Sequence, residues 1–212
     1  QRNYVIGPCR RGLQPAQQSQ AQPEGCAYNG ITLSAHSPHD ARKDPQMPEV
    51  ITTYLQMSAL KELVPAPMND PDFIVREAVE RDWRLNRALY LLVGEQWGWI
   101  DKLGWSDLDW ERYAADEQRR TFVASLRGAT AGYYELRRDD AQAVEVAYFG
   151  LASDFIGRGL GGALLTDALK RAWSWDAQRV WLHTCTLDHP AALKNYLARG
   201  MRVYDRKTRQ VD

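Results

Sequence analysis

The chain has 212 residues, in which 27 Lys and Arg balance 27 Asp and Glu, and 25% of the residues are charged. This length is typical of one domain with an additional segment, and the zero net charge is against the uniformly basic surface of a nucleic-acid-binding protein. No apolar run approaches the length of a membrane span, so no contact with a membrane is expected. The three cysteines have neither disulfide-framework nor metal-ligand spacing, and a cytoplasmic protein without a metal is therefore expected.

Residues 1–46 differ in composition from the rest of the chain. They are rich in Gln and Pro and show neither helical nor strand periodicity, and the chain does not begin with Met. Such a segment buries too little apolar surface to offset the entropy lost on ordering, and it has no apolar stretch typical of a signal peptide. We expect residues 1–46 to be a disordered extension, or translated sequence upstream of the true start, and residues 47–212 to form the domain.

Regular periodicity starts after Met47. The pattern predicts two short strands at residues 51–57 and 73–78, and then two helices at 80–93 and 108–115 with an aromatic stretch between them. Three strands follow, at 121–126, 130–136 and 143–151. The glycine-rich stretch "GRGLGG" follows, and then an apolar stripe from Leu164 to Trp173 that predicts an amphipathic helix. A strand over 179–187, a helix over 189–199 and a short strand near Val203 complete the order.

This order predicts the fold class. The strands that flank the glycine-rich helix should be parallel, whereas the three strands before them should form an antiparallel meander. We therefore expect an α/β domain of the α+β kind, with a mixed, mostly antiparallel central sheet, one parallel β-α-β unit and helices on both faces.

The stretch "GRGLGG", Gly157 to Gly162, has the G-x-G-x-x-G spacing of a dinucleotide-binding turn. A Rossmann fold would place that turn after its first strand and would need about 100 further residues, but here the meander of three strands comes before the turn and about fifty residues come after it. The physical property of the motif remains, because glycines and a helix start let backbone amides approach a phosphate. The sequence thus disfavours NAD and favours another pyrophosphate-bearing ligand.

Two stretches carry a family resemblance. "DFIGRGLGGALL" resembles the acyl-CoA pyrophosphate loop of the GCN5-related N-acetyltransferase (GNAT) family, whose pattern falls here on Ile156, Gly159 and Gly161. "HPAALKNYLARGM" is similar to the later family signature, and the matching positions are His189, Ala192, Tyr196, Gly200 and Met201. Ile156, His189 and Met201 replace the usual Arg or Gln, Asn and Phe. The resemblance covers about residues 73–203, with 47–72 as an N-terminal addition.

The resemblance implies the GNAT fold and a function. The chain would transfer an acetyl group from acetyl-CoA, its co-substrate, to a small-molecule or peptide amine by direct attack in a ternary complex, and a homodimer would be typical. The residues implied to bind acetyl-CoA are Phe149, Gly150, Leu151, Ile156, Gly157, Arg158, Gly159, Leu160, Gly161, Gly162 and His189. The alternative is a non-catalytic acyl-CoA-binding module of the same fold.

Two residues are candidates for catalysis. Glu145 is the one charged residue in an apolar strand, where the family often has its base, and its alternative is a carboxylate paired with an arginine. Tyr196 matches the family's general acid, and its alternative is a packed helix residue. Glu135 is a rival carboxylate, although its neighbouring arginines favour an ion pair, and His183 could relay a proton or be a core histidine.

The aromatic stretch "GEQWGWIDKLGW" falls where the family places its acceptor-binding segment. Trp97 and Trp99 could form an aromatic wall or hold an amine by cation–π contact, and Glu95 could attract a cationic acceptor. The alternative for the tryptophans is packing of the two helices onto the sheet.

Overall fold

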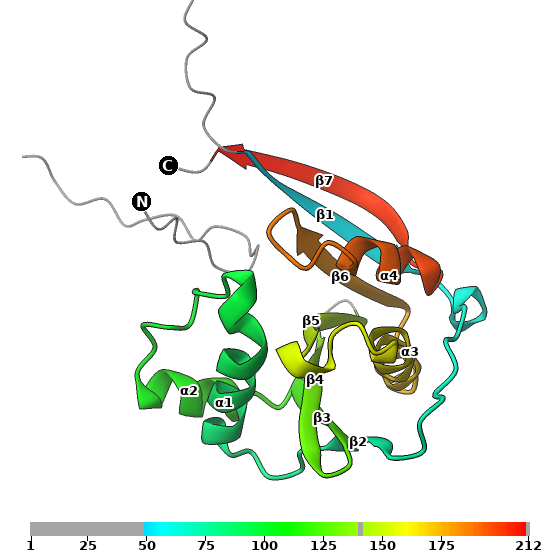
Figure 1. The fold of residues 1–212 in the computed structure, drawn as a ribbon. Helices are drawn as coiled ribbons and strands as arrows, with labels where there is room; N and C mark the ends of the chain where they lie inside the picture. Colours follow the sequence, from blue (N-terminus) through cyan, green and yellow to red (C-terminus); the bar gives the residue numbers. More distant parts are fainter. Residues whose placement is uncertain (1–48, 140–141, 211–212) are drawn as a thin grey trace, which may run out of the picture.

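The central sheet has seven strands in the order β2-β3-β4-β5-β6-β1-β7 (Figure 1). The computed structural model describes residues 49–139 and 142–210. The strands are β1 Glu49–Met57, β2 Phe73–Glu77, β3 Arg119–Leu126, β4 Ala129–Arg138, β5 Ala143–Leu151, β6 Arg179–Cys185 and β7 Arg202–Gln210. The helices are α1 Trp83–Gly94, α2 Asp107–Ala114, α3 Leu160–Trp173 and α4 Ala192–Ala198, with single 3₁₀ turns η1 Leu60–Glu62, η2 Glu95–Trp97 and η3 Ser153–Phe155.

The predicted strand directions are confirmed. β2 to β5 form an antiparallel meander, and β5 and β6, which flank α3, are parallel. The predicted extension over residues 1–46 lies outside the described residues. None of the helices in the part of the chain that the structure describes is long and apolar enough to cross a membrane.

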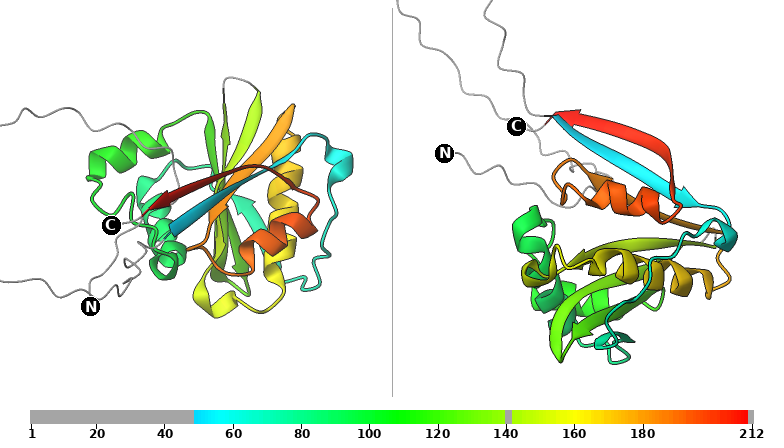
Figure 2. Two further views of the ribbon diagram at one scale, coloured as in Figure 1. Left: turned by 90° about the horizontal axis from the view of Figure 1, so that it is seen from above. Right: turned by 45° about the vertical axis from the view of Figure 1, so that its right-hand side comes forward.

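Helices cover both faces of the sheet, as Figure 2 shows. On one face, α3 and α4 pack on β1, β4, β5 and β6. The predicted stripe from Leu164 to Trp173 is buried there as far as Ala172, and Trp173 is half-buried. On the other face, α1 and α2 cover β3 to β5 through an aromatic cluster of Tyr90, Trp99, Trp110, Tyr133 and Tyr148 with Leu89 and Val93. The unusual number of Trp and Tyr residues therefore builds a second core.

Two segments differ from the predicted bounds. The last strand, β7, runs for nine residues rather than a few, because its backbone pairs with β1 along its length while most of its side chains stay exposed. The last helix, α4, begins at Ala192 rather than 189, because residues 189–191 form a turn in which Ala192 N–H donates to the His189 carbonyl at 2.8 Å.

The feature that positions the site is a divergence of two strands. β5 and β6 pair only from Ala143 to Glu145, and beyond Glu145 the strands separate. In the same region the β4–β5 register shifts between Leu136 and Glu135, which leaves Ala147 as an extra residue in β5. Such a bulge bends the strand and interrupts its pairing, so the sheet opens at its centre.

Candidate functional site

A cavity of about 330 Å³ lies where β5 and β6 separate. Its walls come from the end of α1 and the segment after it, from β5 after Glu145, from the glycine-rich loop and the start of α3, from β6, and from the turn and first residues of α4. The cavity thus joins the two stretches that carry the family resemblance.

The glycine-rich loop presents backbone amides to this cavity. Gly157 and Gly159 have φ of 81° and 77°, and a Cβ at either position would meet nothing within 4 Å. The glycines are therefore required by the left-handed backbone and not by crowding. Gly159 caps α3 without a side-chain hydrogen bond, whereas α1 and α2 have the side-chain caps Asp82 and Ser106. The first amides of α3 and its positive dipole end are consequently available to an anion.

Most of the residues predicted to bind acetyl-CoA line this cavity. They are Phe149, Gly150, Leu151, Ile156, Gly157, Gly159, Leu160, Gly161, Gly162 and His189. Arg158 differs, because its guanidinium lies over the Phe155 ring, 5.1 Å from the centroid. Gly150 also has a packing role, since a Cβ there would overlap the Val93 side chain of α1.

Tyr196 projects from α4 into the same cavity, with its ring 5.9 Å from that of Phe149. It is 6% exposed. Burial raises the pKa of the Tyr196 hydroxyl well above its usual value, and the charge of Asp188 raises it further. Tyr196 therefore keeps its proton at neutral pH, as a proton donor must. Its neighbour Asn195, which the sequence did not single out, also lines the cavity and donates to the Gly161 carbonyl at 3.1 Å.

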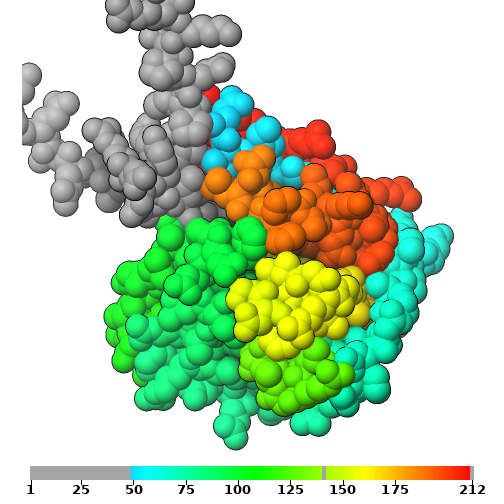
Figure 3. Space-filling view, in the orientation of Figure 1, coloured from blue at the N-terminus to red at the C-terminus, as the bar shows by residue number. Residues whose placement is uncertain are grey.

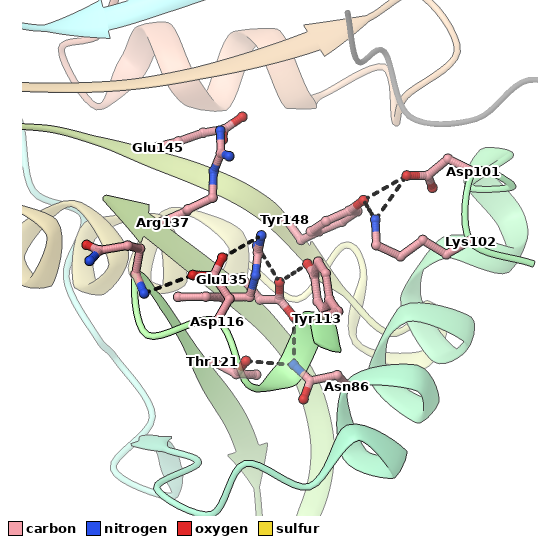
Figure 4. A network of polar contacts seen from close by, with 12 residues as sticks. Asn86, Asp101, Lys102, Tyr113, Asp116, Thr121, Glu135, Arg137, Glu145 and Tyr148 are labelled. Carbon is pink, nitrogen blue, oxygen red and sulfur yellow. Dashed lines mark hydrogen bonds and ion pairs between the residues drawn. The ribbon is translucent and has the colours of Figure 1, made fainter. Parts of the chain in front are cut away.

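Glu145 lies at the point where the strands diverge, and it is 3% exposed. Its Oε2 accepts from Arg137 Nε at 3.0 Å and lies 2.8 Å from Arg137 Nη2 (Figure 4), so the arginine-paired alternative describes this geometry. His183, on β6, does line the cavity, and its Nδ1 lies 3.8 Å from Glu145 Oε1. The imidazole thus lies between the cavity and the carboxylate.

Glu135, the rival carboxylate, is buried in a polar network under α1 and α2 (Figure 4). It accepts hydrogen bonds from Asn86 at 2.9 Å, from Arg119 at 3.2 Å and from Tyr113. The expected ion pair is present, but its partner is Arg119 on β3 rather than a sequence neighbour. These bonds assign Glu135 a structural role.

The aromatic stretch contributes two different tryptophans. Trp97 is partly exposed, and its ring lies 4.8 Å from that of His189, so it reaches across the cavity mouth to the turn before α4. Trp99 is 9% exposed and packs on Tyr148 and Tyr133, which agrees with the packing alternative. Glu95 is exposed at the end of α1.

The segment after these tryptophans contains a buried lysine that the sequence did not single out. Lys102 is 3% exposed and donates to Asp101 Oδ2 at 3.0 Å and to the Tyr148 hydroxyl (Figure 4). Its ammonium also lies 4.5 Å from the ring centroids of Trp105 and Tyr148. Because Tyr148 lines the cavity, this lysine fastens the aromatic segment to the wall of the site.

A mixed sheet with a cavity between two diverging strands, beside a glycine-rich helix start, defines the class of α/β fold. Residues 78–201 match the model of the acetyltransferase (GNAT) family. The chain therefore belongs to the GNAT acetyltransferase family.

Individual relatives agree with this family assignment. The chain is 32% identical over 144 residues to mycothiol acetyltransferase of Corynebacterium aurimucosum, a match that covers 60% of this chain but only 44% of that protein. Solved structures of GCN5-related N-acetyltransferases share the fold. The structure from Kribbella flavida has a TM-score of 0.55 and 14% sequence identity, and the match covers 74% of this chain and 56% of that one. The structure from Sphaerobacter thermophilus has a TM-score of 0.54 and 17% sequence identity, and the match covers 77% of this chain and 52% of that one.

Proposed function

We propose that this chain transfers an acetyl group from acetyl-CoA to an amine acceptor, by direct attack while both substrates are bound. The observation that carries the proposal is the cavity that joins the uncapped start of α3 to the Tyr196 hydroxyl. The glycine loop suits the pyrophosphate of the donor, and the slot beside β5 suits its pantetheine arm. A mycothiol acetyltransferase relative with limited coverage supports acetyl transfer but does not define the acceptor.

Acetyl-CoA supplies the acetyl group as a thioester. The acceptor must first lose a proton, because an amine with a pKa of about 10 is mostly protonated at neutral pH. His183 and His189 both line the cavity, and we assign the base to His183 because the Glu145 carboxylate behind it, 3.8 Å from Nδ1, can stabilise the resulting imidazolium. In this proposal Glu145, the candidate base from the sequence, acts through His183.

The electron pair of the amine nitrogen then forms a C–N bond with the acetyl carbonyl carbon, and the C–S bond breaks. The sulfur leaves with the electron pair of that bond and takes the hydroxyl proton of Tyr196. The acylated nitrogen loses its second proton to water and Tyr196 regains a proton from water, so that CoA and the neutral amide are released. The buried position of Tyr196, which raises its pKa, keeps the hydroxyl protonated at neutral pH.

The experiment is CoA release measured with acetyl-CoA and a panel of amines. His183→Gln and Tyr196→Phe should each lower turnover by about 10²- to 10⁴-fold while CoA binding stays near the parental value. Tyr204→Phe is the matched control, because Tyr204 lies on β7 and is 40% exposed, so it should be silent. Binding of CoA without turnover of any amine would support the non-catalytic module instead.

The pH profile distinguishes the two candidate bases. A carboxylate beside an imidazole favours the protonated imidazole, so Glu145→Gln should move the acidic limb of kcat/KM to lower pH and leave a measurable rate. If Glu145 itself were the base, Glu145→Gln would abolish that limb, and His183→Gln would retain it.

A further inference from the structure

Arg199, the residue that follows α4, holds its guanidinium against the start of α3. A Cβ at Gly162 would lie 2.5 Å from Arg199 Nη1 and 3.7 Å from Arg199 Cζ. Gly162 is the third residue of α3 and lines the cavity. The guanidinium therefore lies against the first turn of α3, next to a residue that lines the cavity.

A segment outside the family match holds this arginine. Residues 59–66, which we call the strap, precede the matched range of 78–201 and run beside α4 (Figure 3, cyan beside orange-red). Arg199 Nε donates to the Val64 carbonyl at 2.9 Å, and Val64 N–H donates to the Arg199 carbonyl at 3.1 Å. The strap also reaches α3, where Ala66 N–H donates to Thr166 Oγ1 at 2.9 Å.

The charge of Arg199 is not neutralised by a neighbour. Among residues 49–139 and 142–210, no carboxylate forms an ion pair with Arg199, and its side-chain hydrogen bonds there use Nε alone. Arg202, three residues further on, is paired with Glu62 at 3.9 Å. The two Nη groups of Arg199 thus remain to face an anion, next to a helix start that has no side-chain cap.

We propose that Arg199, positioned by the strap, binds a phosphate group of the CoA donor. The proposal rests on the proposed function and adds a residue that the family signatures do not include. A guanidinium fixed through Nε offers its two Nη groups as a fork that matches two phosphate oxygens. A Cβ at Gly162 would overlap both Arg199 Nη1, at 2.5 Å, and Ala66 Cβ of the strap, at 2.9 Å, whereas a Cβ at Gly161 would have ordinary contacts, 3.7 Å from Asn195 Nδ2.

The test is calorimetric binding of three probes, CoA, 3′-dephospho-CoA and pantetheine, to the full chain. Arg199→Met removes the charge and keeps an unbranched apolar stem, so it should weaken CoA binding by about 10- to 100-fold, the range of a charged hydrogen bond, and leave pantetheine unchanged. If the 3′-phosphate is the partner, the loss should disappear with dephospho-CoA. If the pyrophosphate is the partner, the loss should persist with dephospho-CoA.

The controls keep the two proposals separate. Arg202→Met removes a nearby exposed arginine and should bind all three probes like the parent. A parent that does not bind CoA contradicts the proposed function, whereas a parent and an Arg199→Met variant that bind CoA equally contradict this inference alone. If Arg199→Met does not fold, Arg199→Lys serves instead. The lysine ammonium lacks the two Nη groups of the guanidinium, so the Arg199→Lys variant should bind CoA more weakly than the parent and pantetheine equally well. Equal CoA affinity of the variant and the parent would overturn the proposal.

Discussion

Lys102 is buried although an ammonium is costly to remove from water. Its compensation comes from the Asp101 carboxylate, the Tyr148 hydroxyl and the surrounding ring faces. The carboxylate in turn accepts from Tyr90 at 2.6 Å and from Tyr148 at 3.0 Å. At the scale of single residues, this network, like the one around Glu135, departs from a purely apolar core.

Removing one charge of the Asp101–Lys102 pair should lower the free energy of unfolding more than removing both charges. Asp101→Asn leaves the buried ammonium without its carboxylate, and we expect a loss of about 3–5 kcal/mol in the free energy of unfolding. Lys102→Met combined with Asp101→Asn removes both charges, and much of that loss should be recovered. Urea unfolding of the parent, both single variants and the double variant measures the coupling. Strictly additive losses would contradict the assigned pairing.

Residue positions that depend on long-range contacts were not predictable from the sequence. A single charge in an apolar strand drew attention to Glu145, but its partner Arg137 follows from the register of β4 against β5, which the sequence does not display. Lys102 was missed for the same reason, because its partner Tyr148 is 46 residues away along the chain.

At the scale of elements, apolar periodicity predicted the helices and strands whose position depends on burying one face. The apolar stripe of α3 and the alternation of β2 were confirmed, because burial of one face imposes those periods. β7 was underestimated because its nine residues are stabilised by backbone pairing with β1 rather than by buried side chains. The divergence of β5 from β6 leaves no sequence signal, since β5 is largely apolar on both faces before and after the point where it leaves β6.

Two tryptophans in the segment from η2 to α2 should have different roles, Trp99 in stability and Trp97 in acceptor binding. Trp99→Ala removes a ring from the aromatic cluster and should lower the free energy of unfolding by about 3–5 kcal/mol. Trp97 is partly exposed at the cavity mouth, so Trp97→Ala should change stability by much less and should instead raise the KM for the amine. Thermal unfolding and steady-state kinetics of both variants provide the measurement. A Trp97→Ala variant with parental KM would remove Trp97 from the acceptor site.

At the scale of the whole molecule, the fold buries tyrosines on both sides of the sheet. Tyr90 and Tyr133 belong to the aromatic cluster under α1 and α2, and Tyr134 and Tyr196 belong to the core under α3 and α4. All four are at most 6% exposed. Burial, as the largest cause, raises the pKa of each hydroxyl well above its usual value, and neighbouring carboxylates add to this effect.

These raised pKa values predict a steep alkaline limit to stability. In the unfolded chain each tyrosine loses its proton near about pH 10, whereas in the folded protein the four hydroxyls stay protonated above that pH. Their contribution to stability is therefore complete below about pH 10 and falls as the pH rises above it, by about 1.4 kcal/mol per pH unit for each fully buried hydroxyl.

Tyrosinate absorbance and circular dichroism, followed together during an alkaline titration, measure this limit. Exposed tyrosines such as Tyr204 should titrate first, with the fold intact. The four buried hydroxyls named above should then ionise in a cooperative step that coincides with the loss of the helical signal, because unfolding exposes them to water at a pH above their unfolded pKa. If all ten tyrosines of the chain ionised gradually near about pH 10 with the helical signal unchanged, the burial of these hydroxyls in both cores would be contradicted.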